Sequence, residues 1–139
     1  MASKAAPIRT RPMSPHLQVW KWGPHMTVSI LHRVTGSGMA TVGTALLVWF
    51  LAALASGEKA YARFVDVFTA SSGKLNVIGW IVGVGLTLSL FQHMASGIRH
   101  LVMDTGAAFE LKTNKTLAYL TFAFSLTMTA LFWFAVGAR

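Results

Sequence analysis

The sequence predicts an all-α membrane protein with three transmembrane helices. Three blocks of the 139-residue chain contain no Asp, Glu, Lys or Arg, and they cover residues 34–57, 75–98 and 116–138. A helix needs about 20 apolar residues to cross a bilayer, and each block is long enough. Backbone groups in lipid must find hydrogen-bond partners within their own segment, so these blocks are expected to be helical. Since 54% of the residues are hydrophobic and only 12% are charged, little sequence remains for a soluble core.

The elements follow in a simple order within a single membrane-anchor domain, residues 1–139. Residues 1–24 are polar and carry four prolines, so they are expected to form an extended cytoplasmic arm. Pro24 suits the first turn of the first helix. The expected membrane spans cover approximately residues 28–55, 75–99 and 116–138.

Two smaller features predict how these segments are arranged. The loop between the first and second spans is expected to hold a short interfacial helix around residues 61–68. Small residues recur four positions apart, as Gly36 with Ala40 and Gly79 with Gly83. Such pairs allow helix backbones to approach closely, and they predict tight packing within a helical bundle.

The basic residues predict the orientation. The formal net charge is +8, and eight of the twelve Lys and Arg residues lie before the first span or between the second and third. The positive-inside rule therefore predicts a cytoplasmic N-terminus. Because these residues sit in short segments beside the spans, they indicate contact with membrane lipid and no nucleic acid partner. The chain has no cysteine, so any redox cofactor depends on His or Met for protein ligands.

Ser29 and Arg33 form the first candidate site, near the expected cytoplasmic end of the first span. Residues four apart on a helix share a face, and this face continues to Gly36. A hydroxyl beside a guanidinium can bond a carbonyl oxygen and stabilise negative charge that builds on it. Taken alone, the pair is more typical of a snorkelling arginine and a polar helix start.

His93 is the centre of the second candidate site. It lies inside the charge-free block 75–98, and Gly97 and His100 share its helical face. A neutral imidazole can ligate haem iron through one nitrogen while a hydrogen bond orients the other. Arg99 and His100 lie nearer water, where they are suited to pair with propionates. Taken alone, an intramembrane histidine more often bonds a neighbouring helix.

Three segments together resemble the cytochrome b subunit of succinate dehydrogenase. They are residues 11–17 (RPMSPHL), 29–36 (SILHRVTG) and 93–104 (HMASGIRHLVMD). The resemblance covers all three expected helices in order, length and orientation. It implies a membrane anchor that binds one haem b together with a second anchor subunit, which completes the helical bundle.

The resemblance also implies a role for each candidate residue. His93 is expected to be an axial ligand of the haem, and the second axial histidine is expected from the partner anchor. Ser29 and Arg33 are expected to line the pocket in which the substrate ubiquinone is reduced. The vicinity of the haem propionates is expected to contain His32, Arg99 and His100.

The implied setting is a succinate:ubiquinone oxidoreductase. Its flavoprotein subunit would oxidise succinate, its iron–sulfur subunit would pass electrons on, and this chain would contribute only to quinone reduction. A multi-pass position in the bacterial inner membrane is expected, ahead of the mitochondrial inner membrane. Two alternatives remain: the anchor of a quinol:fumarate reductase, and a non-redox structural membrane subunit.

Overall fold

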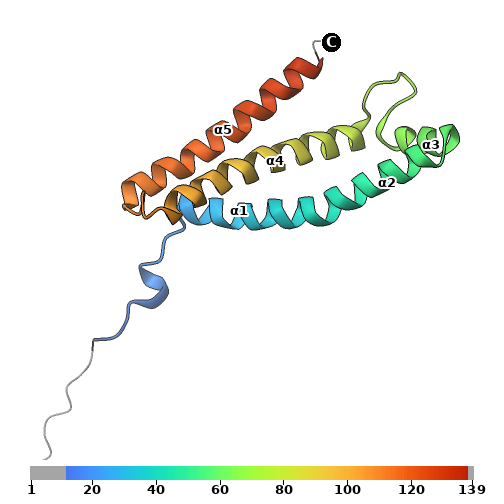
Figure 1. The fold of residues 1–139 in the computed structure, drawn as a ribbon. Coiled ribbons are helices and arrows are strands. Elements are labelled where there is room, and N and C mark those ends of the chain that lie inside the picture. Colours follow the sequence, from blue (N-terminus) through green and yellow to red (C-terminus); the bar gives the residue numbers. More distant parts are fainter. Residues whose placement is uncertain (1–11, 138–139) are drawn as a thin grey trace, which may run out of the picture.

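The computed structural model describes residues 12–137, and the regular structure in that range is helical apart from one isolated β-bridge. In Figure 1, the start of α1, the end of α4 and the start of α5 lie at the same end of the molecule. The elements are η1 (His16–Gln18), α1 (Pro24–Gly38), η2 (Met39–Gly43), α2 (Thr44–Ala55), α3 (Glu58–Phe68), α4 (Val77–Asp104) and α5 (Leu111–Gly137).

Three helices are long and apolar enough to cross a membrane, which confirms the predicted number and type. They are Pro24–Ala55, Val77–Asp104 and Leu111–Gly137, with 32, 28 and 27 residues. The first and third helices begin before their uncharged blocks, and the second helix ends after its block. Residues 1–11 of the predicted arm and residue 138 of the third predicted span lie outside the described residues.

The helices continue past charged residues because their ends are set by local backbone bonding. Pro24 occupies the first turn of α1, as predicted. Asn76 caps α4, and its side chain accepts a hydrogen bond from the backbone N–H of Gly79. At its other end, α4 runs on through Arg99 to Asp104. A charged residue near the end of an uncharged block therefore does not mark the end of the helix.

The first membrane-length helix contains a π-helical turn that the sequence did not reveal. Residues Met39–Gly43 form η2 between α1 and α2, and the ribbon changes direction along this stretch in Figure 1. Within this turn, the Thr41 hydroxyl donates to the Ser37 carbonyl oxygen at 2.7 Å. Single π turns of this kind are a common cause of bends in long helices.

The short helix α3 folds back against α2 through aromatic contacts. The Phe64 ring packs against Trp49 and Phe50, with ring centroids 4.9 and 5.5 Å away. The predicted short helix around residues 61–68 is thus confirmed, and it begins earlier, at Glu58. The helix α3 therefore lies at the end of the molecule opposite the start of α1 (Figure 1).

The close backbone approach predicted for Gly79 and Gly83 is confirmed at Gly79, whereas Gly83 accommodates an aromatic side chain. A Cβ atom on Gly79 would collide with the backbone carbonyl oxygen of Phe68, at the end of α3. A Cβ atom on Gly83 would stand 2.8 Å from the Trp133 ring of α5. Gly79 therefore lets α4 approach the end of α3, and Gly83 leaves room for the Trp133 ring of α5.

The contact between α4 and α5 is built from small and polar side chains. Ala118, Thr121, Ser125 and Thr129 are the buried residues of α5. The Ser125 hydroxyl lies 2.7 Å from Oε1 of the buried Gln92 on α4 and donates a hydrogen bond to it. Small hydroxyl-bearing residues allow close packing where lipid gives no hydrophobic drive for helix association.

Candidate functional site: a histidine cluster between α1 and α4

Three histidines from two helices meet near the end of the molecule where α1 begins and α4 ends. His32 comes from α1, while His93 and His100 come from α4. The rings of His32 and His93 stack with centroids 4.0 Å apart and planes within 8° of parallel. The His100 ring meets His32 edge-on at 5.0 Å. Since His32 contacts both rings, the two α4 histidines share one face, as their spacing predicts.

A backbone carbonyl orients the His93 ring. The Nδ1 atom of His93 lies 3.0 Å from the carbonyl oxygen of His32 and 3.3 Å from the Thr35 hydroxyl. A carbonyl oxygen only accepts, so Nδ1–H is the donor in this bond. The Thr35 hydroxyl itself donates to the Leu31 carbonyl oxygen at 2.7 Å. The other ring nitrogen, Nε2, then carries the lone pair with which a neutral imidazole ligates a metal.

Gly36 leaves the space that the His93 ring occupies. A Cβ atom at position 36 would stand 2.7 Å from Cε1 of His93. Gly97 instead faces His32, and a Cβ atom there would make an ordinary contact of 3.8 Å with Cε1 of that ring. Ala40, which was predicted to continue the packing face of Gly36, is exposed in this chain. Within this chain, Gly36 therefore accommodates an imidazole rather than a helix backbone.

Ser96 holds the second imidazole, and the sequence interpretation missed it. Its side chain is fully buried, and its Oγ lies 2.8 Å from Nδ1 of His32. The Ser96 hydroxyl donates to the Gln92 carbonyl oxygen at 2.7 Å, so it accepts the bond from His32. The available sequence signal was the spacing of three residues from His93, which puts both side chains on one side of α4.

A pocket of about 400 Å³ beside the cluster brings several predicted residues together. Ser29 of α1 lines it with Arg99 and His100 of α4. Arg33, which was expected to act beside Ser29, is exposed and does not line this pocket. The other lining residues are His25, Met26, Met103, Phe109, Leu111 and Asn114. The pocket thus joins the start of α1 to the end of α4 and the start of α5.

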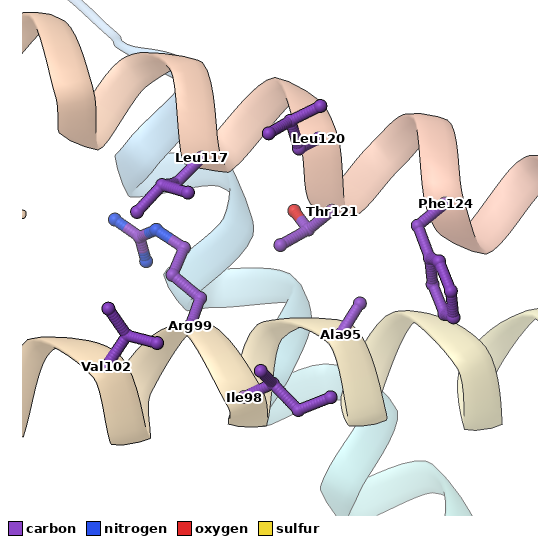
Figure 2. A pocket seen from close by; sticks show the side chains of 8 residues that line it. All are labelled: Ala95, Ile98, Arg99, Val102, Leu117, Leu120, Thr121 and Phe124. Atoms are coloured by element: carbon purple, nitrogen blue, oxygen red, sulfur yellow. The ribbon is translucent and has the colours of Figure 1, made fainter.

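Arg99 lies on a different side of α4 from His93. Six residues along a helix rotate a side chain by about 120° from the first position. The Arg99 guanidinium donates from Nη2 to Oδ1 of Asn114 on α5 at 2.6 Å, a contact that the sequence did not predict. Figure 2 shows this side chain reaching toward Leu117 of α5, with Ala95 farther along the same groove. Of the three residues expected near propionates, the two histidines are in ring contact, and Arg99 shares only the pocket lining with His100.

These features define a class of protein: a small transmembrane chain with an oriented imidazole near one end of its helices. The model of one family, described as the succinate dehydrogenase/fumarate reductase transmembrane subunit, matches residues 7–132. The chain belongs to this family. The resemblance to the cytochrome b subunit that the three sequence segments predicted is therefore confirmed.

Named relatives cover most of the chain. It is 31% identical over 123 residues to the succinate dehydrogenase cytochrome b556 subunit of Rickettsia felis, covering 88% of this chain and 90% of the relative. It is 31% identical over 125 residues to the succinate dehydrogenase cytochrome b560 subunit of Reclinomonas americana, covering 88% and 84%. The mitochondrial cytochrome b560 subunit of Mus musculus is 35% identical over 97 residues, which are 69% of this chain and 54% of the mouse protein.

Proposed function

We propose that this chain is a haem b-binding membrane anchor of a succinate:ubiquinone oxidoreductase. Its relatives carry the names of cytochrome b556 and b560 subunits of succinate dehydrogenase. The observation that carries the proposal is the hydrogen bond from Nδ1 of His93 to the carbonyl oxygen of His32. This bond leaves Nε2 as the ligating nitrogen, which is the arrangement expected of a metal-bound histidine.

The residues around His93 suit one haem shared between two subunits. His93 would supply one iron-ligating nitrogen, and a histidine of a partner anchor would supply the other. His32 and His100 lie beside this ring, in the proposed vicinity of the haem propionates. The Nδ1–H of His32 is donated to Ser96, so His100 is the imidazole suited to bond a propionate carboxylate. Gly36 keeps the ring free of a steric clash with α1. When bound, the haem supplies a one-electron redox centre, and the chain's residues hold and orient it.

Ser29 and Arg33 are this chain's proposed contribution to ubiquinone reduction. Arg33 is exposed, so its guanidinium is accessible to a ligand or a partner subunit on that face of α1. The Ser29 hydroxyl donates to a quinone carbonyl oxygen, and Arg33 stabilises the negative charge that builds on the quinone during reduction. With the N-terminus in the cytoplasm, protons reach this site from the cytoplasmic side.

The proposed partners are a second membrane anchor, an iron–sulfur subunit and a flavoprotein. The flavoprotein oxidises succinate, so this chain takes no part in that step. Relatives occur in bacteria and as a mitochondrial protein in mouse. We place the chain in a bacterial inner membrane as a multi-pass subunit, with the mitochondrial inner membrane as the second candidate. An arm at residues 1–24 and spans near 28–55, 75–99 and 116–138 belong to the same proposal.

A difference spectrum of the complex, purified with its partner subunits, tests the haem assignment. The dithionite-reduced minus oxidised spectrum is expected to show a b-type signal that His93→Ala abolishes or strongly shifts. His16→Ala is the matched control, because His16 is exposed in the arm and lies outside the cluster. An assembled wild-type complex without a b-type signal would contradict the proposal and favour a structural, non-redox subunit.

Two activities measured side by side test the quinone assignment. Ser29→Ala and Arg33→Gln are expected to lower succinate-dependent reduction of ubiquinone by about tenfold or more, since each removes a charge-stabilising contact. Succinate oxidation with a soluble artificial electron acceptor should be unchanged. Ser37→Ala, on an exposed position of α1, serves as the control. Equal loss of both activities would point to failed assembly instead.

The reverse reaction remains a second candidate function, because the description of the family covers fumarate reductase as well. The named relatives quoted above are subunits of succinate dehydrogenase, which favours the forward direction. Comparing succinate oxidation by ubiquinone with fumarate reduction by a quinol in the same preparation separates the two.

A further inference from the structure

Arg99 is a buried positive charge that has no counter-charge among the described residues. A guanidinium stays protonated in proteins, and the Arg99 side chain is only 6% exposed. Nη2 donates to Asn114, while Nε has no hydrogen-bond partner among the described residues. Within the same described residues, no carboxylate forms an ion pair with it. A charge in a membrane helix is costly unless it is paired, so an anion from outside the described residues is expected.

The groove next to Arg99 is apolar along the rest of its length. It lies between α4 and α5, holds about 220 Å³ and is shown in Figure 2. Arg99 and Thr121 are its polar lining residues, and the Thr121 hydroxyl already donates to the Ala118 carbonyl oxygen at 2.7 Å. The remaining lining residues are Ala95, Ile98, Val102, Leu117, Leu120 and Phe124. The groove therefore combines one cation with a surface suited to a hydrocarbon chain.

We propose that this groove binds a membrane phospholipid, with its phosphate at Arg99 and one acyl chain between α4 and α5. Arg99 lies close to the end of α4, at the level where headgroups are expected, and the groove lining on α4 extends from Val102 past Arg99 to Ala95. Guanidinium groups pair well with phosphate oxygens through parallel N–H bonds. Ile98 and Leu120, on the groove lining, are more than half exposed, so an acyl chain can enter from the side. Arg99 lies about 120° around α4 from His93 and shares a pocket lining with His100, so lipid retention and the haem spectrum are measured separately.

Lipid retention in the purified complex tests the proposal. The complex, with its partner subunits, is washed in detergent, and its bound phospholipids are counted by native mass spectrometry. Arg99→Gln is expected to reduce the retained phospholipid by about tenfold or more, the loss expected from a charge-assisted hydrogen bond. Lys115→Gln is the matched control, because it removes the same charge from an exposed position in the first turns of α5. Equal retention in wild type and Arg99→Gln would overturn the proposal.

Photolabelling of the wild-type complex gives a second test that does not depend on the variant's assembly. Nanodiscs are prepared with phosphatidylglycerol that carries a photoactivatable diazirine on one acyl chain. Crosslinks are expected on peptides 95–102 and 117–124, which contain the groove lining. Crosslinks confined to other segments would refute lipid binding here, as would a partner subunit crosslinked into the groove. A haem spectrum that shifts in Arg99→Gln while lipid retention stays constant would identify a propionate as the counter-charge.

Discussion

The His93 ring depends on the absence of a side chain at position 36. Gly36→Ala is expected to displace this ring, because the added Cβ atom would stand 2.7 Å from its Cε1. The expected result is a shifted or weakened b-type difference spectrum in the purified complex. Gly38→Ala is the matched control on the same helix, since nothing lies within 4 Å of a Cβ atom at that position. Identical spectra for the two variants would show that the ring does not pack against α1.

The buried Ser96 hydroxyl is expected to stabilise the protein through its hydrogen bond with His32. Ser96→Ala leaves Nδ1 of His32 without its acceptor, and loss of this partly buried hydrogen bond costs about 1 kcal/mol. The thermal unfolding midpoint of the complex should therefore fall. Ser56→Ala removes a similar hydroxyl bond to the helix backbone, at 2.7 Å, from an exposed position. That control should change stability by no more than about 0.5 kcal/mol.

Sequence reasoning found those site residues whose chemistry is unusual in a membrane helix. His93 and His100 stand out because ionisable groups are rare there, and their spacing gave their shared face. Ser96 and Asn114 did not stand out, because a hydroxyl or amide gains its role only from a partner on another helix. The position of Arg99 illustrates the same limit, since spacing gives its angle on α4 but not what lies opposite.

Among the helices, α3 and α4 are held together where a glycine meets a backbone carbonyl. Gly79→Ala is expected to force α3 away from α4, because its Cβ atom would collide with the Phe68 carbonyl oxygen. Overpacking of this kind costs about 1–3 kcal/mol, measured as a lower thermal unfolding midpoint. Gly85→Ala on the same helix meets nothing within 4 Å and should be neutral or slightly stabilising, since alanine favours helix. Equal midpoints would contradict this contact.

The number and type of long helices were predictable, and their ends were not. A long apolar segment without charged residues is sufficient to predict a membrane-length helix, since few other backbone structures can cross a bilayer. Ends depend on single bonds, such as the Asn76 side chain that caps α4. The π turn at Met39–Gly43 depends on a backbone bonding pattern that leaves no periodic trace in so uniformly apolar a stretch.

For the whole molecule, the charge distribution predicts which ends of the helices face the cytoplasm. The natural chain has no cysteine, so Ser71→Cys and Ala107→Cys each introduce a single thiol into it. Both positions are exposed, one in the loop after α3 and the other in the loop before α5. A membrane-impermeant maleimide should label Ala107→Cys only in inside-out vesicles and Ser71→Cys only in right-side-out vesicles. The opposite pattern would reverse the predicted orientation.

In the proposed complex, this chain provides only part of the haem and quinone sites. The outer faces of the long helices carry large exposed apolar side chains, including Ile30, Val34 and Leu101. Lipid and partner helices are both suited to such surfaces, and the sequence of this chain does not distinguish them. A second axial histidine or the rest of a quinone pocket would come from residues of other subunits, outside the reach of this sequence.

The π turn sets the rotation of α2 relative to α1 about the axis of the first long helix. At one end α1 turns His32 toward α4, and at the other α2 turns Trp49 toward α3. One additional residue in a helix rotates everything beyond it by about 100°. Adding or removing a residue within Met39–Gly43 would therefore misdirect the imidazole or the indole, even though the helix would still span the same membrane. Substitution there preserves the rotation, so this segment tolerates a change of residue type far better than a change of residue number.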